Sequence, residues 1–369
     1  MSDAKGIKQV GHVDCAGGGQ IIVDRGIAYV GHIDAPNGTS IFDVKDPKNP
    51  KRLAELSMSP GLHSHKVRVG NGIMVINRER VSPENPQEMG GLDIFDIENP
   101  ADPKLITRWE TPGKGVHRFD FDGRYFYGSP TVEGYRGNIM MIMDLADPTR
   151  PEEVGRWWMP GQWTAGGEEP SWSRSAHRCH HPLRRGDRLY TSYWHGGFVI
   201  LDIADMSKPK LISHLDWSPP FPSPTHSAVP LPFELEGHKF LLVADEDVQP
   251  LFPGPPAMLW MVDITQEDRP VPVASHQLAH LDGSPQPKQT GCHQPIEKVT
   301  SPEVPVAWFA NGLRIIDISR PHATREIAHY VPDPAPGAKR AASNDVFVDE
   351  RGLIYLLDRF GGLEIVERM

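Results

Sequence analysis

The sequence has few cysteines and no long hydrophobic run. Its three cysteines, Cys15, Cys179 and Cys292, are too few, and odd in number, for the disulfide framework of a small secreted domain. No stretch of about 18 apolar residues occurs, so the sequence offers no candidate transmembrane helix. The first residues also lack the charged and then apolar pattern of a signal peptide. We therefore expect a cytoplasmic protein, or else a mature chain whose leader has already been removed.

Concentrated positive charge is absent as well. The formal net charge is −10, and lysine and arginine form no block anywhere in the chain. Surfaces that bind nucleic acid or anionic membranes usually carry such a block, so neither partner is expected. The chain also has no Gly-x-Ser-x-Gly elbow, no phosphate-binding glycine loop and no Cys-x-x-Cys pair. These absences argue against the common serine hydrolase, nucleotide-binding and thiol redox sites.

The chain does contain a long internal repeat. Seven apolar runs each end in an acidic residue, and successive acidic ends are separated by 48 to 61 residues. The acidic ends are Asp43, Asp96, Asp144, Asp202, Asp263, Asp317 and Glu367. Repeats of that length, each holding one four-stranded unit, are typical of β-propeller blades. Short β-branched and aromatic runs between Gly, Pro and Asp turns support the same interpretation.

The repeat predicts an all-β protein, a seven-bladed β-propeller of four-stranded blades. Because it spans nearly the whole chain, we expect residues 1–369 to form a single domain. The chain ends after a third strand, Leu363–Glu367, and begins with Ile7–Val13, which resembles a fourth strand. The N-terminal strand should therefore complete the last blade and cover its open sheet edge.

A histidine opens the first strand in five of the seven repeats, whereas Gly19–Gln20 and Asn344 take this position in the other two. The five histidines are His65, His117, His180, His226 and His293. Equivalent positions of propeller blades point toward one axis, so the five imidazoles are expected to converge. His181 is an alternative to His180, because adjacent strand residues face opposite sides.

Convergent imidazoles predict a transition-metal site, because neutral imidazole suits Zn, Cu, Fe and Ni. Iron or copper is the favoured metal, and manganese or zinc would also fit. The simpler interpretation is that each histidine is a polar residue hydrogen-bonded at a sheet end. Five histidines at one equivalent position favour the metal site over that interpretation.

Three further residues are candidates for catalysis. His195 and Arg78 lie in loops predicted on the same face as the histidines, where they could move protons or orient a substrate. Asp345 follows Asn344 and is a candidate acceptor for an imidazole N–H group. The ordinary alternative for each is a polar residue of a solvated loop.

The third-strand motif, as in Val199–Ile203 and Leu313–Ile318, resembles the LVIVD-repeat β-propeller family along the whole chain. Within it, His180–Pro182 followed by Tyr190–Trp194 resembles the selenium-binding protein and methanethiol oxidase group. That resemblance implies a histidine-bound metal, copper in the oxidase, with His180 or His181 as a ligand. The paired cysteines expected near the N-terminus of that group are missing, since only Cys15 stands there.

The leading hypothesis is an oxidoreductase or oxygenase that holds one metal ion and acts on a small organic substrate. Neutral histidine ligands leave the charge of the metal uncancelled, so an anionic or sulfur-containing substrate would gain by direct ligation. One alternative is a redox-neutral lyase, isomerase or hydrolase that uses the metal as a Lewis acid. Another is a non-catalytic propeller that binds a protein partner. The sequence leaves the oligomeric state open.

Overall fold

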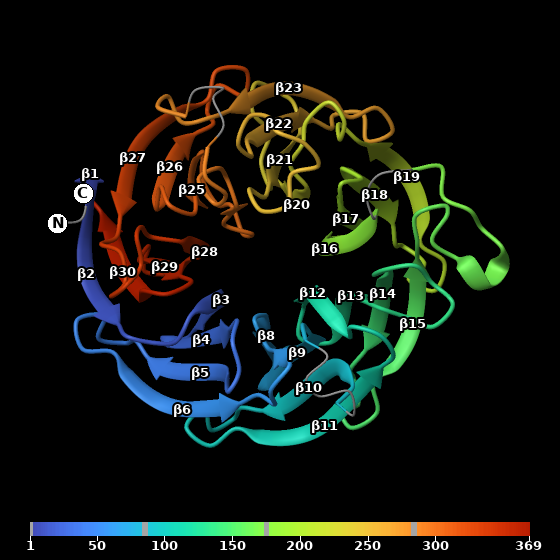
Figure 1. Cartoon of the computed structure of the whole chain (residues 1–369), viewed down its shortest axis with the longest axis horizontal. Helices are drawn as coiled ribbons and strands as arrows, with labels where there is room; N and C mark the ends of the chain where they lie inside the picture. The colour runs from blue at the N-terminus through green and yellow to red at the C-terminus, as the bar shows by residue number, and fades with distance from the viewer. Residues whose placement is uncertain (1–2, 83–87, 173–176, 282–285) are drawn as a thin grey trace. The chain divides into compact units, whose positions relative to one another are not determined.

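The computed structural model of this chain describes residues 3–82, 88–172, 177–281 and 286–369. Within these residues the regular secondary structure is almost entirely β-strand, and the one helical turn described is η1 (Thr164–Gly166). Seven antiparallel sheets follow one another along the chain, as Figure 1 shows. The fold is the predicted seven-bladed β-propeller, with one sheet for each blade.

The first four blades are described by the strands that compose them. The first contains β3 (Gly18–Asp24), β4 (Ile27–His32), β5 (Asn37–Asp43) and β6 (Lys51–Ser57). The second contains β7 (Leu62–His63), β8 (Val67–Gly70), β9 (Ile73–Arg80), β10 (Gly90–Asp96) and β11 (Lys104–Thr111). The third contains β12 (Val116–Phe121), β13 (Tyr125–Pro130), β14 (Met140–Asp144) and β15 (Glu152–Trp157). The fourth contains β16 (Arg178–Arg185), β17 (Arg188–Trp194), β18 (Phe198–Asp202) and β19 (Lys210–Leu215).

The last three blades follow the same plan, and two of them include N-terminal strands. The fifth contains β20 (Thr225–Pro230), β21 (Phe240–Asp245), β22 (Leu259–Asp263) and β23 (Val271–His276). The sixth contains β24 (Gln294–Pro295), β25 (Glu303–Ala307), β26 (Leu313–Asp317), β27 (Arg325–Val331) and β1 (Asp3–Lys5). The seventh contains β28 (Ser343–Val348), β29 (Ile354–Asp358), β30 (Gly362–Arg368) and β2 (Ile7–Val13).

The N-terminal segment completes the last blade, as predicted. Strand β2 pairs with β30 in an antiparallel register that joins Ile7 to Arg368 and Val13 to Leu363. The preceding strand β1 pairs with β27 and adds a fifth strand to the sixth blade. One short segment therefore covers the open edges of two sheets.

The acidic end of the repeat has a local structural role. At six ends the aspartate Oδ1 accepts a hydrogen bond of 2.8 to 2.9 Å from the backbone N–H two residues later. These ends are Asp43, Asp96, Asp144, Asp202, Asp263 and Asp317. The side chain thereby initiates the turn between the third and fourth strands, which is a favoured use of aspartate.

The described chain divides into two compact units. The first unit comprises Met1–Asp14, Tyr190–Leu201 and Leu211–Met369, and the second comprises Cys15–Leu189 and Asp202–Lys210. Each unit has its own apolar core between sheets. In the second unit Leu92, Phe119 and Met141 belong to one buried cluster, and in the first unit Leu241 and Trp260 belong to another.

Candidate metal centre

The residue that opens the first strand lies at an irregularity in the sheet. In four blades the register between the first and second strands shifts at this residue, outside the regular pairing. The four residues are Gly19, His117, His226 and Asn344. Such β-bulges re-aim a side chain and are frequent beside functional sites. The four positions therefore share the same backbone irregularity, in agreement with their alignment in the sequence repeat.

In the second and sixth blades the histidine lies outside a regular strand. His65 lies between β7 and β8, and His293 immediately precedes β24. The first blade has glycines here because the backbone of His65 approaches it closely. A Cβ atom on Gly19 would lie 2.4 Å from the carbonyl oxygen of His65, and one on Gly31 would lie 2.7 Å from its carbonyl carbon. The missing imidazole of the first blade thus leaves space for the chain that carries His65.

In the second unit, three of the predicted ligands lie side by side. The ring centroids of His65 and His117 are 5.0 Å apart, and those of His117 and His180 are 4.8 Å apart. The Nε2 atoms of His117 and His180 approach to 3.0 Å, so His180 is the member of the His180–His181 pair that faces His117. Burial lowers the pKa of both His65 and His117, which favours the neutral imidazole that binds metals.

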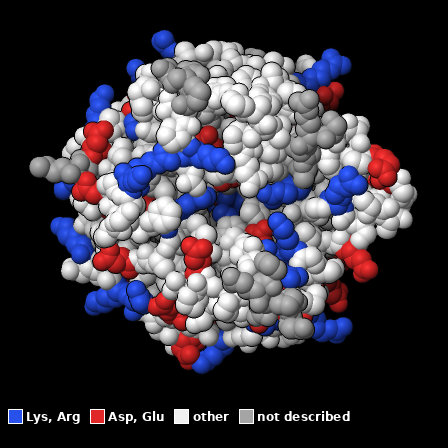
Figure 2. Space-filling model, viewed as in Figure 1, with Lys and Arg blue, Asp and Glu red and all other residues white. Residues whose placement is uncertain are grey.

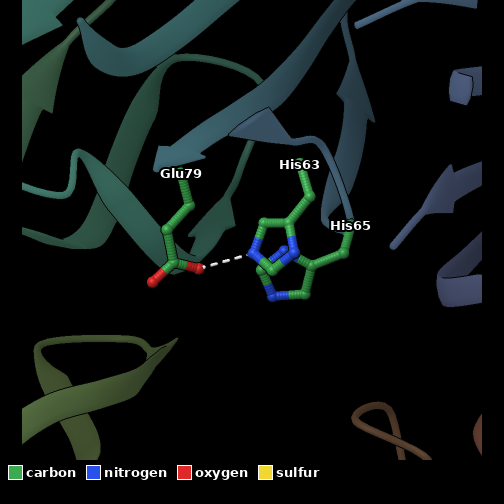
Figure 3. A group of neighbouring side chains, drawn as sticks. All are labelled: His63, His65 and Glu79. Atoms are coloured by element: carbon green, nitrogen blue, oxygen red, sulfur yellow. Dashed lines mark hydrogen bonds and ion pairs between the residues drawn. The ribbon is translucent and has the colours of Figure 1, made fainter. Parts of the chain in front are cut away.

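A buried carboxylate, Glu79 of β9, connects two of the imidazoles. Its Oε2 atom accepts hydrogen bonds from Nδ1 of His117 at 2.6 Å and from Nε2 of His63 at 2.8 Å. One nitrogen of His63, one of His65 and one oxygen of Glu79 lie within 4.8 Å of one another, in the group drawn in Figure 3. Because a carboxylate can only accept, Nδ1 of His117 carries the proton, and the Nε2 lone pair is available to a metal.

The ring of His65 is positioned by an amide. Asn77 accepts a hydrogen bond from the backbone N–H of Lys66 through Oδ1 at 2.8 Å, and its Nδ2 donates to the carbonyl of Val116 at 2.9 Å. These two bonds orient the amide so that Nδ2 also faces Nδ1 of His65 at 3.2 Å. Metal binding through Nε2 of His65 would move the ring proton to Nδ1 and break this longer contact.

In the first unit, His226 and His293 form a second pair of imidazoles. Their ring centroids are 4.3 Å apart, and His293 also stacks on Phe309 at 4.5 Å. Nδ1 of His293 donates to the backbone carbonyl of Asn344, which leaves its Nε2 unprotonated in the neutral ring. That Nε2 atom lies 3.4 Å from Oε1 of Glu246.

An arginine lies beside this pair. The Arg359 guanidinium lies over the ring of Phe309 at 5.0 Å and donates through Nε to Oδ1 of Asn344 at 2.6 Å. Its Nη2 atom is 3.6 Å from Oε1 of Glu246, so the arginine and His293 share one carboxylate. Cationic and anionic side chains are therefore held in fixed positions around the imidazoles of the first unit.

The three predicted catalytic residues contact groups other than the imidazoles described above. Arg78 is buried, and its guanidinium contacts Glu88 at 2.6 Å and Asp93 at 3.4 Å. Asp345 accepts a hydrogen bond from the Gln294 amide at 2.5 Å, and the backbone carbonyl of Asn344 accepts one from Nδ1 of His293.

His195 has a left-handed backbone, with φ of 50°, and lies at the turn after β17. Its Nε2 atom bonds to the carbonyl oxygen of Gln249 at 3.0 Å. The three catalytic assignments remain predictions.

In the sequence Glu79 is one of several polar residues predicted on the histidine face, with Arg78 preferred over it, and His63 is not among the predicted ligands. Arg78 and Glu79 are adjacent in β9, so their side chains point to opposite faces of the sheet. Only the structure shows that Glu79 is on the histidine side, whereas Arg78 faces the carboxylates of Glu88 and Asp93. The available signal was the spacing of the histidines at positions 63 and 65. Residues two apart in an extended segment point to the same side, so His63 could be expected beside His65.

Charged side chains of both signs are visible on one face of the protein (Figure 2). On the face drawn in Figure 2, Lys and Arg side chains are interspersed with Asp and Glu side chains. Among the residues that the structure describes, no helix has the length and apolar character that a membrane crossing requires.

Three solved structures illustrate the similarity of this chain to known folds, each at low sequence identity. The β-propeller domain of Cps50 (Swd1) from Myceliophteria thermophila has a TM-score of 0.60 and 12% identity, covering 98% of this chain and 100% of that one. Sqt1 from Saccharomyces cerevisiae has a TM-score of 0.60 and 9% identity, with 100% of both chains covered. The periplasmic gluconolactonase PpgL of Pseudomonas aeruginosa has a TM-score of 0.57 and 11% identity, covering 85% of this chain and 88% of that one. At such identities the likeness establishes the fold alone.

One of the two sequence comparisons identifies the repeat. No curated protein is significantly similar to this chain, so the resemblance to the selenium-binding group remains a prediction. The model of the LVIVD repeat matches residues 87–111, 185–216 and 305–331. Each stretch contains a third strand with its aspartate end and the fourth strand that follows it. The chain is therefore a β-propeller that contains LVIVD repeats.

Proposed function

We propose that this protein is a metal-dependent enzyme in which buried histidines bind a transition-metal ion through Nε2. The observation that carries the proposal is the environment of His117. Its Nδ1 donates to the carboxylate of Glu79, and its Nε2 faces Nε2 of His180 at 3.0 Å. Metal-binding histidines usually donate their other N–H to a carboxylate or a backbone carbonyl, as His117 and His293 do here.

The spacing of the two Nε2 atoms supports the same proposal. Two imidazole nitrogens bound at about 2.1 Å to one ion, at a right angle, would lie about 3.0 Å apart. His117 and His180 have this separation in the protein alone. We assign His117 and His180 as ligands in the second unit, with His65 beside them. Sharing of one ion by all five histidines stays a prediction.

The ligand chemistry favours iron or copper, which would supply Lewis acidity and one-electron redox chemistry to a bound substrate. Glu79 orients His117 and increases the basicity of its ring. Histidine ligands are neutral, so a small organic anion such as a carboxylate, phenolate or thiolate gains most from binding at the ion. This reasoning makes an oxidoreductase or oxygenase the leading assignment.

A redox-neutral hydrolase is the second candidate. The observation in its favour is the similarity in fold to a gluconolactonase, a propeller whose name states a hydrolytic activity. A metal that acts only as a Lewis acid would serve such a reaction with the same histidines. Oxygen uptake during turnover separates the two assignments, because a hydrolase consumes no oxygen.

The test is the metal content of freshly purified protein, measured together with its absorbance spectrum. We expect about one ion per chain in the wild type and a large loss in His117→Ala and His180→Ala. The matched control is His238→Ala, because His238 is exposed and its partner is Asp263, which is not one of the residues assigned to the metal site. Equal metal content in all four proteins would refute the proposal and leave a propeller scaffold as the better explanation.

A further inference from the structure

A cavity of about 740 Å³ lies in the first unit, and none of its lining residues belongs to the histidine clusters described above. Its lining comes from β1, β26, β27 and the segment that follows β23. In Figure 1, β26 and β27 are labelled on the orange and red part of the chain, and β1 is labelled on its blue N-terminal part. A volume of several hundred Å³ is the usual size of a small-molecule site.

A chain of ion pairs runs along this cavity. Arg314 donates through Nη1 to Glu326 at 3.1 Å, and Nδ1 of His329 lies 2.9 Å from the same carboxylate. Nε2 of His329 then reaches Asp3 at 3.4 Å. The side chain of Arg314 is only 7% exposed, whereas that of Asp3 is 76% exposed. The cavity therefore has a buried cation at one end of the chain and an accessible anion at the other.

The network continues beyond Arg314 through an amide. Asn311 donates through Nδ2 to the carbonyl of Thr290 at 2.6 Å, which directs its Oδ1 toward Nε2 of His280 at 2.9 Å. His280 must donate that bond, so its Nδ1 atom is an acceptor when the ring is neutral. The hydrogen bonds of Arg314 within the described residues use Nε and Nη1, and Nη2 remains to donate to a ligand.

Arg314 and Asp3 together suit an extended ligand that carries a negative charge at one end and a positive charge at the other. A carboxylate would bind Arg314, as arginine forks commonly do, and an ammonium group would bind Asp3. The strands at the cavity also suit an extended backbone. Strand β23 is the last strand of its sheet in the described chain, and β27 already accepts the three-residue strand β1 at its edge.

We propose that this cavity binds a short peptide in an extended conformation, with its C-terminal carboxylate on Arg314 and its N-terminal ammonium toward Asp3. The proposal is independent of the metal centre. If the network served only to hold β1 on β27, the cavity would have no affinity for such a ligand.

The test is a calorimetric titration of the full chain with triglycine, N-acetyl-triglycine and triglycinamide. Triglycine should bind, and each blocked peptide should bind about tenfold more weakly, because each loses one charge-assisted hydrogen bond. Asp3→Asn should lower the affinity for triglycine about tenfold and should not change the affinity for the acetylated peptide. Arg314→Lys should lower the affinity for every peptide that carries a free C-terminal carboxylate.

Asp14→Asn provides the matched control, because it removes the same charge from a fully exposed position outside the cavity. It should leave every affinity unchanged. Absence of triglycine binding to the wild type, or equal binding of all three peptides, would overturn the proposal. Asp3→Asn keeps the test decisive if Arg314→Lys proves unstable, because Asp3 is exposed.

Discussion

Replacement of Glu79 should weaken metal binding in two distinguishable steps. Its Oε2 atom accepts both the His117 and the His63 hydrogen bonds, at 2.6 and 2.8 Å. Glu79→Gln keeps an acceptor oxygen of the same shape but removes the charge that raises the basicity of His117. Glu79→Ala removes the acceptor as well and leaves two largely buried N–H groups without it.

The loss of a group that orients a metal ligand typically lowers metal affinity 10- to 100-fold. We expect the glutamine variant near the lower limit and the alanine variant near the upper limit. These factors correspond to about 1.4 and about 2.8 kcal/mol. The alanine variant should also lose about 1–3 kcal/mol of folding free energy through its unsatisfied imidazole groups.

The assay is a competition titration of Cu²⁺ or Zn²⁺ against a chromophoric chelator, with thermal unfolding measured in parallel. Glu88→Gln is the matched control, because Glu88 is a carboxylate of the same unit whose contacts are with Arg78 and Ser59. It should leave the metal affinity unchanged. If Glu79→Gln and Glu79→Ala bind metal as tightly as the wild type, Glu79 does not support a ligand, and the assignment of His117 fails.

Three further predictions concern stability and metal affinity. Glu364 hydrogen-bonds His12 and raises its pKa to about 9, so this pair stabilises the fold below about pH 6.5. That contribution should be lost as the pH rises through 9, and chemical denaturation should show a flatter pH profile for His12→Gln. Gly19→Ala should displace the backbone of His65 and lower metal affinity, as the same chelator titration would show. Ile142→Ala, in the core of the second unit, should cost about 2–5 kcal/mol in denaturant unfolding, and an unchanged midpoint would contradict the packing described.

Much of the fold could be predicted from the sequence, because the contacts that determine it are local. An aspartate such as Asp144 initiates the turn that follows it by accepting the N–H of Ala146, and this contact needs no distant residue. The N-terminal strand Ile7–Val13 was also predictable, because the last repeat visibly lacks a fourth strand. The extra strand β1 was not, because three residues carry too little pattern to indicate a partner.

The candidate site was predictable in its positions but not in its contacts. Alternation in β9 separates Arg78 from Glu79, yet it does not say which of them faces the histidines. The same holds for His180 and His181, and the structure selects His180 through its contact with His117. For Asn344, the backbone carbonyl rather than the neighbouring carboxylate of Asp345 receives the proton of His293.

The repeat alone was enough to specify seven four-stranded units and the place of a histidine in each of five. The repeat period, the turn residues and the strand lengths are short-range properties, so they can be recognised in the sequence itself. The partners of each imidazole depend on bulges, on sheet faces and on segments up to 63 residues apart, as for His117 and His180. Such contacts arise only when the sheets pack, and for that reason the carboxylate of Glu79 and the cavity beside Arg314 emerge from the tertiary structure alone.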